Sequence, residues 1–148
     1  MLMTGSASMD AERAFARAAR ARRRAALTRR LRGEPADGGR LAVYDERELR
    51  SRPDVEGGIR EIPLGAITAT LEPSRASLFD RWFRPTPAAR GRWQRVWLAE
   101  HRGAVLPPIA VVRVGDAYAV RDGHHRVSVA RARGACTIDA MVGEMPAA

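Results

Sequence analysis

The clearest alternation of apolar and polar positions lies in the last third of the chain. Two apolar runs, residues 109–114 and 117–121, flank the dipeptide Gly115-Asp116. A Gly-Asp pair between two such runs is typical of a tight turn, so this stretch predicts a β-hairpin. Residues 124–133 carry apolar positions at helical spacing, which predicts a helix, and a last strand is expected at 137–142.

Weaker signals of the same kind precede the hairpin. Residues 60–67 predict a short strand and its exit, and residues 71–87 are turn-like sequence around aromatic side chains. Residues 88–101 predict a helix in which Trp93 and Trp97, spaced by four, share one face and belong to the core. The order β, loop, α, β, β, α, β predicts an α+β domain.

The beginning of the chain has a less regular pattern. Asp10 is a suitable N-cap and Gly33 a suitable stop for a helix over residues 10–32. Because its apolar stripe is weak and consists mostly of alanine, we expect this helix to dock loosely or not at all. Residues 34–40 are linker-like, with Gly, Pro and Asp.

Next come residues 41–50, which predict a short helix, and residues 52–58, which are turn-like. We therefore divide the chain into three parts: a basic helical extension and linker over 1–40, a short helix and turn over 41–58, and the compact domain over 59–148.

Charge is concentrated near the N-terminus. The formal net charge is +9, and all 26 basic residues are Arg. Residues 1–34 hold nine Arg against three acidic residues, a net of +6. Three interpretations stay open for this segment: a solvated basic tail, a nucleic-acid-binding arm that contacts phosphates, and a transit peptide. The absence of Lys excludes a P-loop lysine and a Schiff-base lysine.

Composition narrows the setting further. The single cysteine, Cys136, excludes an intramolecular disulfide and argues against a cysteine-based zinc site, so we expect no metal centre. No apolar run approaches the roughly 18 residues of a membrane span. The start of the chain lacks the apolar segment of a secretory signal. We expect a cytoplasmic protein without a membrane partner.

Candidate chemistry is concentrated at residues 122–126, Asp-Gly-His-His-Arg, where a predicted strand gives way to a predicted helix. A helix start offers unpaired N–H groups and a positive dipole end to a phosphate. Gly123 lets the backbone approach closely, Arg126 can make a charge-assisted contact, and His124 and His125 add donors whose charge is adjustable near neutral pH. Asp122 can cap the helix, orient a histidine or hold a metal. Ordinary helix capping is the alternative.

This motif and its context resemble the ParB/sulfiredoxin-like superfamily. The resemblance is carried by Leu-Pro-Pro-Ile-Ala-Val at 106–111, by the hairpin, by Asp-Gly-His-His-Arg-Val-Ser-Val-Ala at 122–130 and by Glu-Ile-Pro-Leu-Gly-Ala-Ile at 61–67, and it covers roughly residues 59–143. It implies a small α+β domain of mixed sheet and helices that binds a nucleotide (CTP, ATP or ADP, with or without Mg²⁺) through its phosphate. The residues so implied are Asp122, Gly123, His124, His125 and Arg126.

Members of this superfamily differ in the motif. Compared with the CTP-binding box of ParB proteins, Gly123 and Arg126 match, whereas His124 and His125 replace a glutamate and an arginine. In sulfiredoxins the catalytic cysteine occupies the position of His124, which argues against sulfiredoxin activity here. The Asp-Gly-His-His-Arg form itself is found in the superfamily's free serine kinases. That similarity implies Glu72 as a catalytic base.

Three functional hypotheses stay open. The first is a nucleotide-binding, DNA-associated or regulatory ParB-like domain, in which the arginine-rich helix contacts DNA. The second is a phosphoryl-transfer enzyme similar to a free serine kinase, with Glu72 as base and with Arg75 contacting a phosphate or carboxylate. The third is a non-catalytic interaction domain. Whether the protein is an enzyme is left open by its sequence.

Overall fold

A mixed sheet of six strands runs through the part of the chain that this computed structural model describes, residues 3–45 and 57–144. The strand order is β1-β3-β5-β4-β6-β2. Neighbouring strands are parallel in β1/β3, β3/β5 and β4/β6, and antiparallel in β4/β5 and β2/β6. The strands are β1 (Ala42–Val43), β2 (Gly57–Pro63), β3 (Ile67–Thr70), β4 (Ile109–Val114), β5 (Ala117–Asp122) and β6 (Thr137–Glu144).

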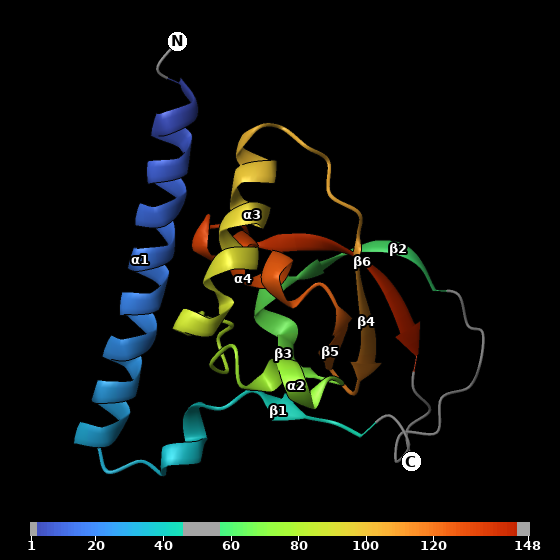
Figure 1. The fold of residues 1–148 in the computed structure, drawn as a ribbon. Helices are drawn as coiled ribbons and strands as arrows, with labels where there is room; N and C mark the ends of the chain where they lie inside the picture. Colours follow the sequence, from blue (N-terminus) through green and yellow to red (C-terminus); the bar gives the residue numbers. More distant parts are fainter. Residues whose placement is uncertain (1–2, 46–56, 145–148) are drawn as a thin grey trace.

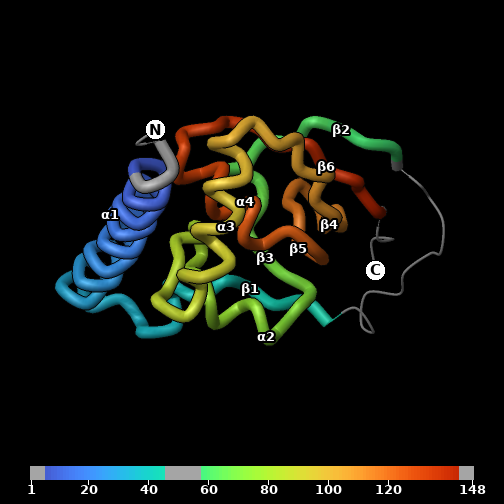
Figure 2. The backbone as a smooth tube through the Cα atoms, turned by 45° about the horizontal axis from the view of Figure 1, so that its top comes forward, coloured from blue at the N-terminus to red at the C-terminus, as the bar shows by residue number. Residues whose placement is uncertain are grey.

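Helices α3 and α4 lie between this sheet and a long N-terminal helix, as Figures 1 and 2 both show. The helices are α1 (Met3–Leu31), α2 (Pro73–Ala76), α3 (Arg90–His101) and α4 (His124–Ala132). Helix α1 packs on α3, and α3 packs on α4. The described residues therefore form an α+β fold, as the sequence predicts. None of the helices in residues 3–45 and 57–144 has both the length and the apolar character needed to cross a membrane.

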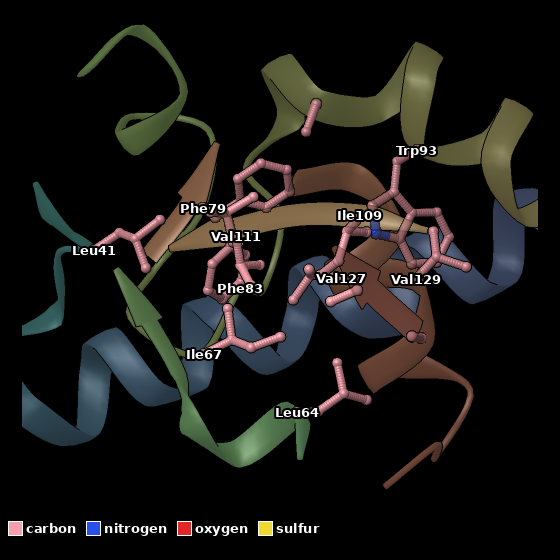
Figure 3. Close-up of a cluster of buried hydrophobic side chains, with 14 of the residues drawn as sticks. Leu41, Leu64, Ile67, Phe79, Phe83, Trp93, Ile109, Val111, Val127 and Val129 are labelled. Atoms are coloured by element: carbon pink, nitrogen blue, oxygen red, sulfur yellow. The ribbon is translucent and has the colours of Figure 1, made fainter. Parts of the chain in front are cut away.

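The core lies between the sheet and α3 and α4, and most of it is aliphatic. Trp93 of α3, Phe79 and Phe83 from the segment before α3, and valines of β4 and α4 meet there (Figure 3). The core is built largely from elements that the sequence predicts. The predicted hairpin β4–β5, the helices α3 and α4 and the strand β6 are confirmed. These elements fix the strand–helix junction that carries the motif.

The sequence-based expectation for α1 is wrong in two respects. The helix begins at Met3 rather than at Asp10, and it docks firmly on the domain. Phe15 is only 2% exposed and meets Trp93 edge to face, with ring centroids 5.5 Å apart. Ala11, Ala14 and Ala19 are also buried, so their small side chains allow close approach of the helix instead of weakening its contact.

The prediction of a short helix at residues 41–50 is also wrong for the residues of this range that the structure describes. Ala42–Val43 form β1, which pairs in parallel with β3, and Leu41 lies in the core. Residues 46–50, and most of the predicted turn at 52–58, lie outside the described residues. Strand β3 is an addition to the predicted order: Ile67 was expected to end a strand, and instead begins the one that pairs with β5.

Candidate functional site

The motif at the start of α4 forms one wall of an open hollow of about 230 Å³. All six residues predicted to bind phosphate contribute to this hollow, together with two residues of α3. Its lining residues are Arg75, Arg92, Val96, Asp122, Gly123, His124, His125 and Arg126. Elements far apart in sequence, α2, α3 and the β5–α4 junction, therefore place their polar side chains around one space.

The junction requires the glycine at position 123. Gly123 has φ = 111°, a left-handed conformation that costs other residues free energy. A Cβ at this position would also collide with the Ile109 side chain, whose Cβ would lie 2.8 Å away. Because the first bond of α4 runs from Val127 N–H to Gly123 O, at 3.0 Å, the N–H groups of the three preceding residues have no intrahelical acceptor.

Both histidines of the motif are largely buried, yet both line the hollow. His124 is 4% exposed and His125 is 6% exposed. Nε2 of His124 lies 2.6 Å from Oγ1 of Thr70, and the ring of His125 packs edge to face on Phe79, with centroids 5.2 Å apart. These contacts hold each ring while leaving part of it at the wall of the hollow.

Burial and nearby arginines keep the two imidazoles neutral. Burial, followed by the charge of Arg75, lowers the pKa of His124 to about 4. Burial, followed by the charges of Arg92 and Arg75, lowers the pKa of His125 to about 4. The expectation of imidazoles that change charge near neutral pH is therefore wrong. They contribute neutral N–H donors and ring nitrogens instead.

Thr70 connects His124 with the main chain of Glu72. Its Oγ1 accepts a hydrogen bond from the N–H of Glu72 at 2.9 Å and makes the short contact to Nε2 of His124, whereas its contacts to two carbonyl oxygens, at 3.4 Å, are long. This hydroxyl therefore fixes the orientation of the His124 ring.

Arg126 is held by the protein. Its Nη1 donates to the carbonyl oxygens of Pro107 and Pro108, and its Nη2 lies 3.3 Å from Oδ2 of Asp122. Asp122 is thus an ion-pair partner and not the helix cap, because the N-cap is Gly123 and no side chain caps α4. Part of the charge of Arg126 is compensated before any ligand arrives.

Arg75 and Arg92 are the two guanidinium groups of the hollow that have no carboxylate partner among the described residues. Sequence reasoning singled out Arg75 and missed Arg92. The one available signal was helical spacing, since Arg92 and Val96 lie one turn apart on the predicted helix and so share a face. Which space that face borders becomes clear only from the tertiary structure.

Glu72 is exposed and does not line the hollow. Its main chain is nonetheless connected to the hollow, because its N–H donates to Thr70 Oγ1, which contacts His124. Its assignment as a catalytic base stays a prediction.

Ser128 and Cys136, whose side chains could act as nucleophiles, have different surroundings. Ser128 is buried and accepts a hydrogen bond from Trp93 Nε1 at 2.9 Å, which gives it a structural role. Cys136 is free and exposed. Within residues 3–45 and 57–144, no three His, Cys, Asp or Glu side chains come together as they would around a metal ion.

The described fold is similar to a known one. A comparison with solved structures finds sulfiredoxin from Arabidopsis thaliana, with a TM-score of 0.43 and 21% sequence identity over 59% of this chain and 85% of that chain. A likeness of this size does not extend to sulfiredoxin's chemistry. No family model matches the chain, and no curated protein sequence matches it.

Proposed function

We propose that the hollow at the start of α4 binds the phosphoryl groups of a nucleotide, and that the protein is a nucleotide-binding domain with a DNA-associated or regulatory role. The observation that carries this proposal is the position of Arg75 and Arg92 beside the N–H groups at the start of α4. Neither guanidinium group has a carboxylate partner among the residues that the structure describes. Helix dipole, N–H donors and guanidinium charge all favour an anion at the same place.

The size of the hollow limits which part of the ligand it holds. Sites that enclose a whole small molecule usually measure about 300–1,000 Å³. At about 230 Å³ and open to solvent, this hollow fits one or two phosphoryl groups, with sugar and base outside it. Selectivity between CTP, ATP and ADP then depends on surfaces around the hollow. The exposed carboxylate of Asp122 at the rim is the group there that suits a Mg²⁺ carried by the nucleotide.

Thermal unfolding with inorganic pyrophosphate, CTP, ATP and ADP, each with and without Mg²⁺, tests the proposal. A ligand that binds only the folded state raises its stability by about 2.7 kcal/mol at one hundred times Kd, which raises Tm. Arg92→Gln should abolish most of the rise. Arg102→Gln removes an exposed arginine that does not line the hollow, and should preserve it. The proposal is wrong if none of these anions raises Tm, or if Arg92→Gln responds like the parent protein.

A phosphoryl-transfer enzyme is the second candidate, because a specific contact connects Glu72 with the hollow. Its N–H shares Thr70 Oγ1 with His124, and Arg75, three residues later, lines the hollow. Transfer of phosphate from ATP or ADP to free serine, followed by chromatography, tests this reading. Loss of transfer in Glu72→Gln with retained nucleotide binding supports it, whereas full transfer by that variant shows that Glu72 is not the base.

The DNA-associated role rests on the outer surface of α1. Arg13, Arg20, Arg23 and Arg24 are exposed there. Phosphate contacts from such a surface should be salt-sensitive and weakly selective for sequence. Since α1 also buries Phe15, its deletion would disturb the core, so the suitable test is a gel shift with the double variant Arg20→Gln/Arg24→Gln. Unchanged DNA affinity in that variant contradicts the role, and a protein that binds neither DNA nor nucleotide fits the interaction-domain hypothesis.

A further inference from the structure

A second and larger space lies between α1 and the domain. This cleft measures about 700 Å³ and is bordered by α1, by the segment 82–85, by Trp97 of α3 and by the last turns of α4. None of its lining residues lines the hollow at the start of α4. The side chains that give it chemical character are four arginines and two tryptophans: Arg17, Arg84, Arg131, Arg133, Trp82 and Trp97.

Arg131 carries the most specific signal in this cleft. Its Nη2 donates to the carbonyl oxygens of Leu64 and Ile67, which fixes the guanidinium plane. Its Nε is buried and has no hydrogen-bond partner. Only one other side-chain nitrogen or oxygen in residues 3–45 and 57–144, Nε of Arg22, shares that condition. Because buried donors are almost always paired, this N–H, on a residue that lines the cleft, calls for an acceptor that the described residues do not supply.

The tryptophans hold two of the arginines in place. The guanidinium carbon of Arg131 lies 5.8 Å from the ring centre of Trp82, and that of Arg133 lies 5.6 Å from the ring centre of Trp97. Such cation–π contacts restrict these long side chains, so less conformational entropy is lost when they bind an anion.

The charge of the cleft is positive after its ion pairs are counted. Arg84 lies 3.4 Å from Asp80, and Arg133 lies 3.7 Å from Glu100. Arg17 and Arg131 have no such ion pair among the described residues. Two positive charges therefore remain to be matched, which favours a ligand with at least two negative charges.

The remaining walls are apolar, and the volume is that of a small-molecule site. Alanines of α1, together with Phe83 and Pro85, line the cleft beside the tryptophans. Volumes of about 300–1,000 Å³ are typical of sites for small ligands. Apolar walls with a few convergent cations suit a molecule with an apolar body and a charged end.

We propose that the cleft between α1 and α4 binds a small organic anion of two or more charges, carboxylate or phosphate, with an apolar or aromatic body. The guanidinium of Arg131, with that of Arg17, contacts its charged end, and Trp82, Phe83 and the alanines of α1 contact its body. This proposal does not rest on nucleotide binding at the start of α4. In this arrangement α1 is one wall of a ligand site as well as a cover for the core.

Calorimetric titration with three matched probes tests the proposal: naphthyl phosphate, naphthalene dicarboxylate and the uncharged naphthol. The protein carries Arg92→Gln, which removes a guanidinium from the other hollow. We expect one site per chain for at least one of the two anions, and much weaker binding of naphthol. The two anions distinguish phosphate from carboxylate ligands.

The variants then assign the site. Arg17 is exposed, so Arg17→Gln should fold normally and weaken anion binding by about tenfold, the value of one charge-assisted hydrogen bond. Arg30→Gln changes an exposed arginine of the same helix that does not line the cleft, and should bind as the parent does. The proposal is overturned if neither anion binds, if naphthol binds as tightly as the anions, or if Arg17→Gln and Arg30→Gln bind alike.

Discussion

Thr70 and His124 are 54 positions apart in the chain, and Oγ1 of Thr70 lies 2.6 Å from Nε2 of His124. Thr70 ends β3, and His124 begins α4 right after β5, the strand that pairs with β3 in parallel. The parallel pairing therefore brings the end of one strand to the start of the helix that follows the other. It places the first histidine of the motif in a fixed orientation at the wall of the hollow.

This contact predicts the effect of Thr70→Val. Valine keeps the shape of the side chain and removes the hydroxyl, so buried Nε2 of His124 and the N–H of Glu72 both lose their partner. We expect a loss of about 1–3 kcal/mol in the free energy of unfolding, measured by urea titration. Thr28→Val, at an exposed hydroxyl of α1, serves as the control and should cost less. Equal losses in the two variants would contradict the assigned role.

Gly123 predicts a second pair of variants. Gly123→Ala introduces a Cβ at positive φ and against Ile109, whereas Gly103→Ala, also at positive φ, introduces one into open space. The backbone term of about 1 kcal/mol is common to both, so the difference in unfolding free energy between them reports the collision. We expect Gly123→Ala to be clearly the less stable variant in thermal unfolding. Similar Tm values would show that α4 can shift away from β4.

Stability should fall as the pH is lowered through the range between 6.5 and about 4. Folding lowers the pKa of His124 and of His125 to about 4, so in this range the unfolded chain binds more protons than the folded one. Each histidine then contributes a slope of up to about 1.4 kcal/mol per pH unit, and this contribution levels off below pH 4.

Urea titrations at several pH values measure this slope. In the double variant His124→Asn/His125→Asn, the free energy of unfolding should depend less steeply on pH than in the parent. The carboxyl groups are the same in the two proteins, so the difference between the two slopes reports the histidines. An unchanged slope in the double variant would mean that the two imidazoles are charged in the folded protein.

The docking of α1 predicts that truncating Phe15 lowers the free energy of unfolding strongly, whereas truncating a side chain farther along the helix lowers it little. Phe15→Ala removes a ring that is 2% exposed and in contact with Trp93, and such core truncations cost about 3–5 kcal/mol. Leu27→Ala changes a side chain that is 57% exposed and should cost well under 1 kcal/mol. Comparable urea midpoints for the two variants would contradict firm docking.

Local signals in the sequence were sufficient for the elements that stabilise themselves locally. The turn at Gly115-Asp116 and the helical spacing after Gly123 identify the hairpin and α4 with little need of their surroundings. Strand β1 could not be identified in this way, because its two residues are strand only through pairing with β3. Helix α1 has a weak apolar stripe because alanines and one phenylalanine make its contact.

The same distinction between local and tertiary features applies to the candidate site. Asp122–Arg126 are contiguous, so the motif itself was visible in the sequence. Arg92 and the neutral state of the histidines were not, because both depend on which side chains from other elements border the hollow. Burial in the tertiary structure lowers the pKa of both histidines, so they are neutral where the residue type alone suggests a charge that varies near neutral pH.

Nuclear magnetic resonance of the ¹⁵N-labelled protein, titrated with inorganic pyrophosphate, tests the central claim most directly. Binding at the start of α4 should produce its largest and saturable shifts at the amide signals of His124, His125 and Arg126, and these shifts should be lost in Arg92→Gln. Shifts confined to the exposed arginines of α1, or no saturable shift at the three amides, would contradict a phosphate site at this junction.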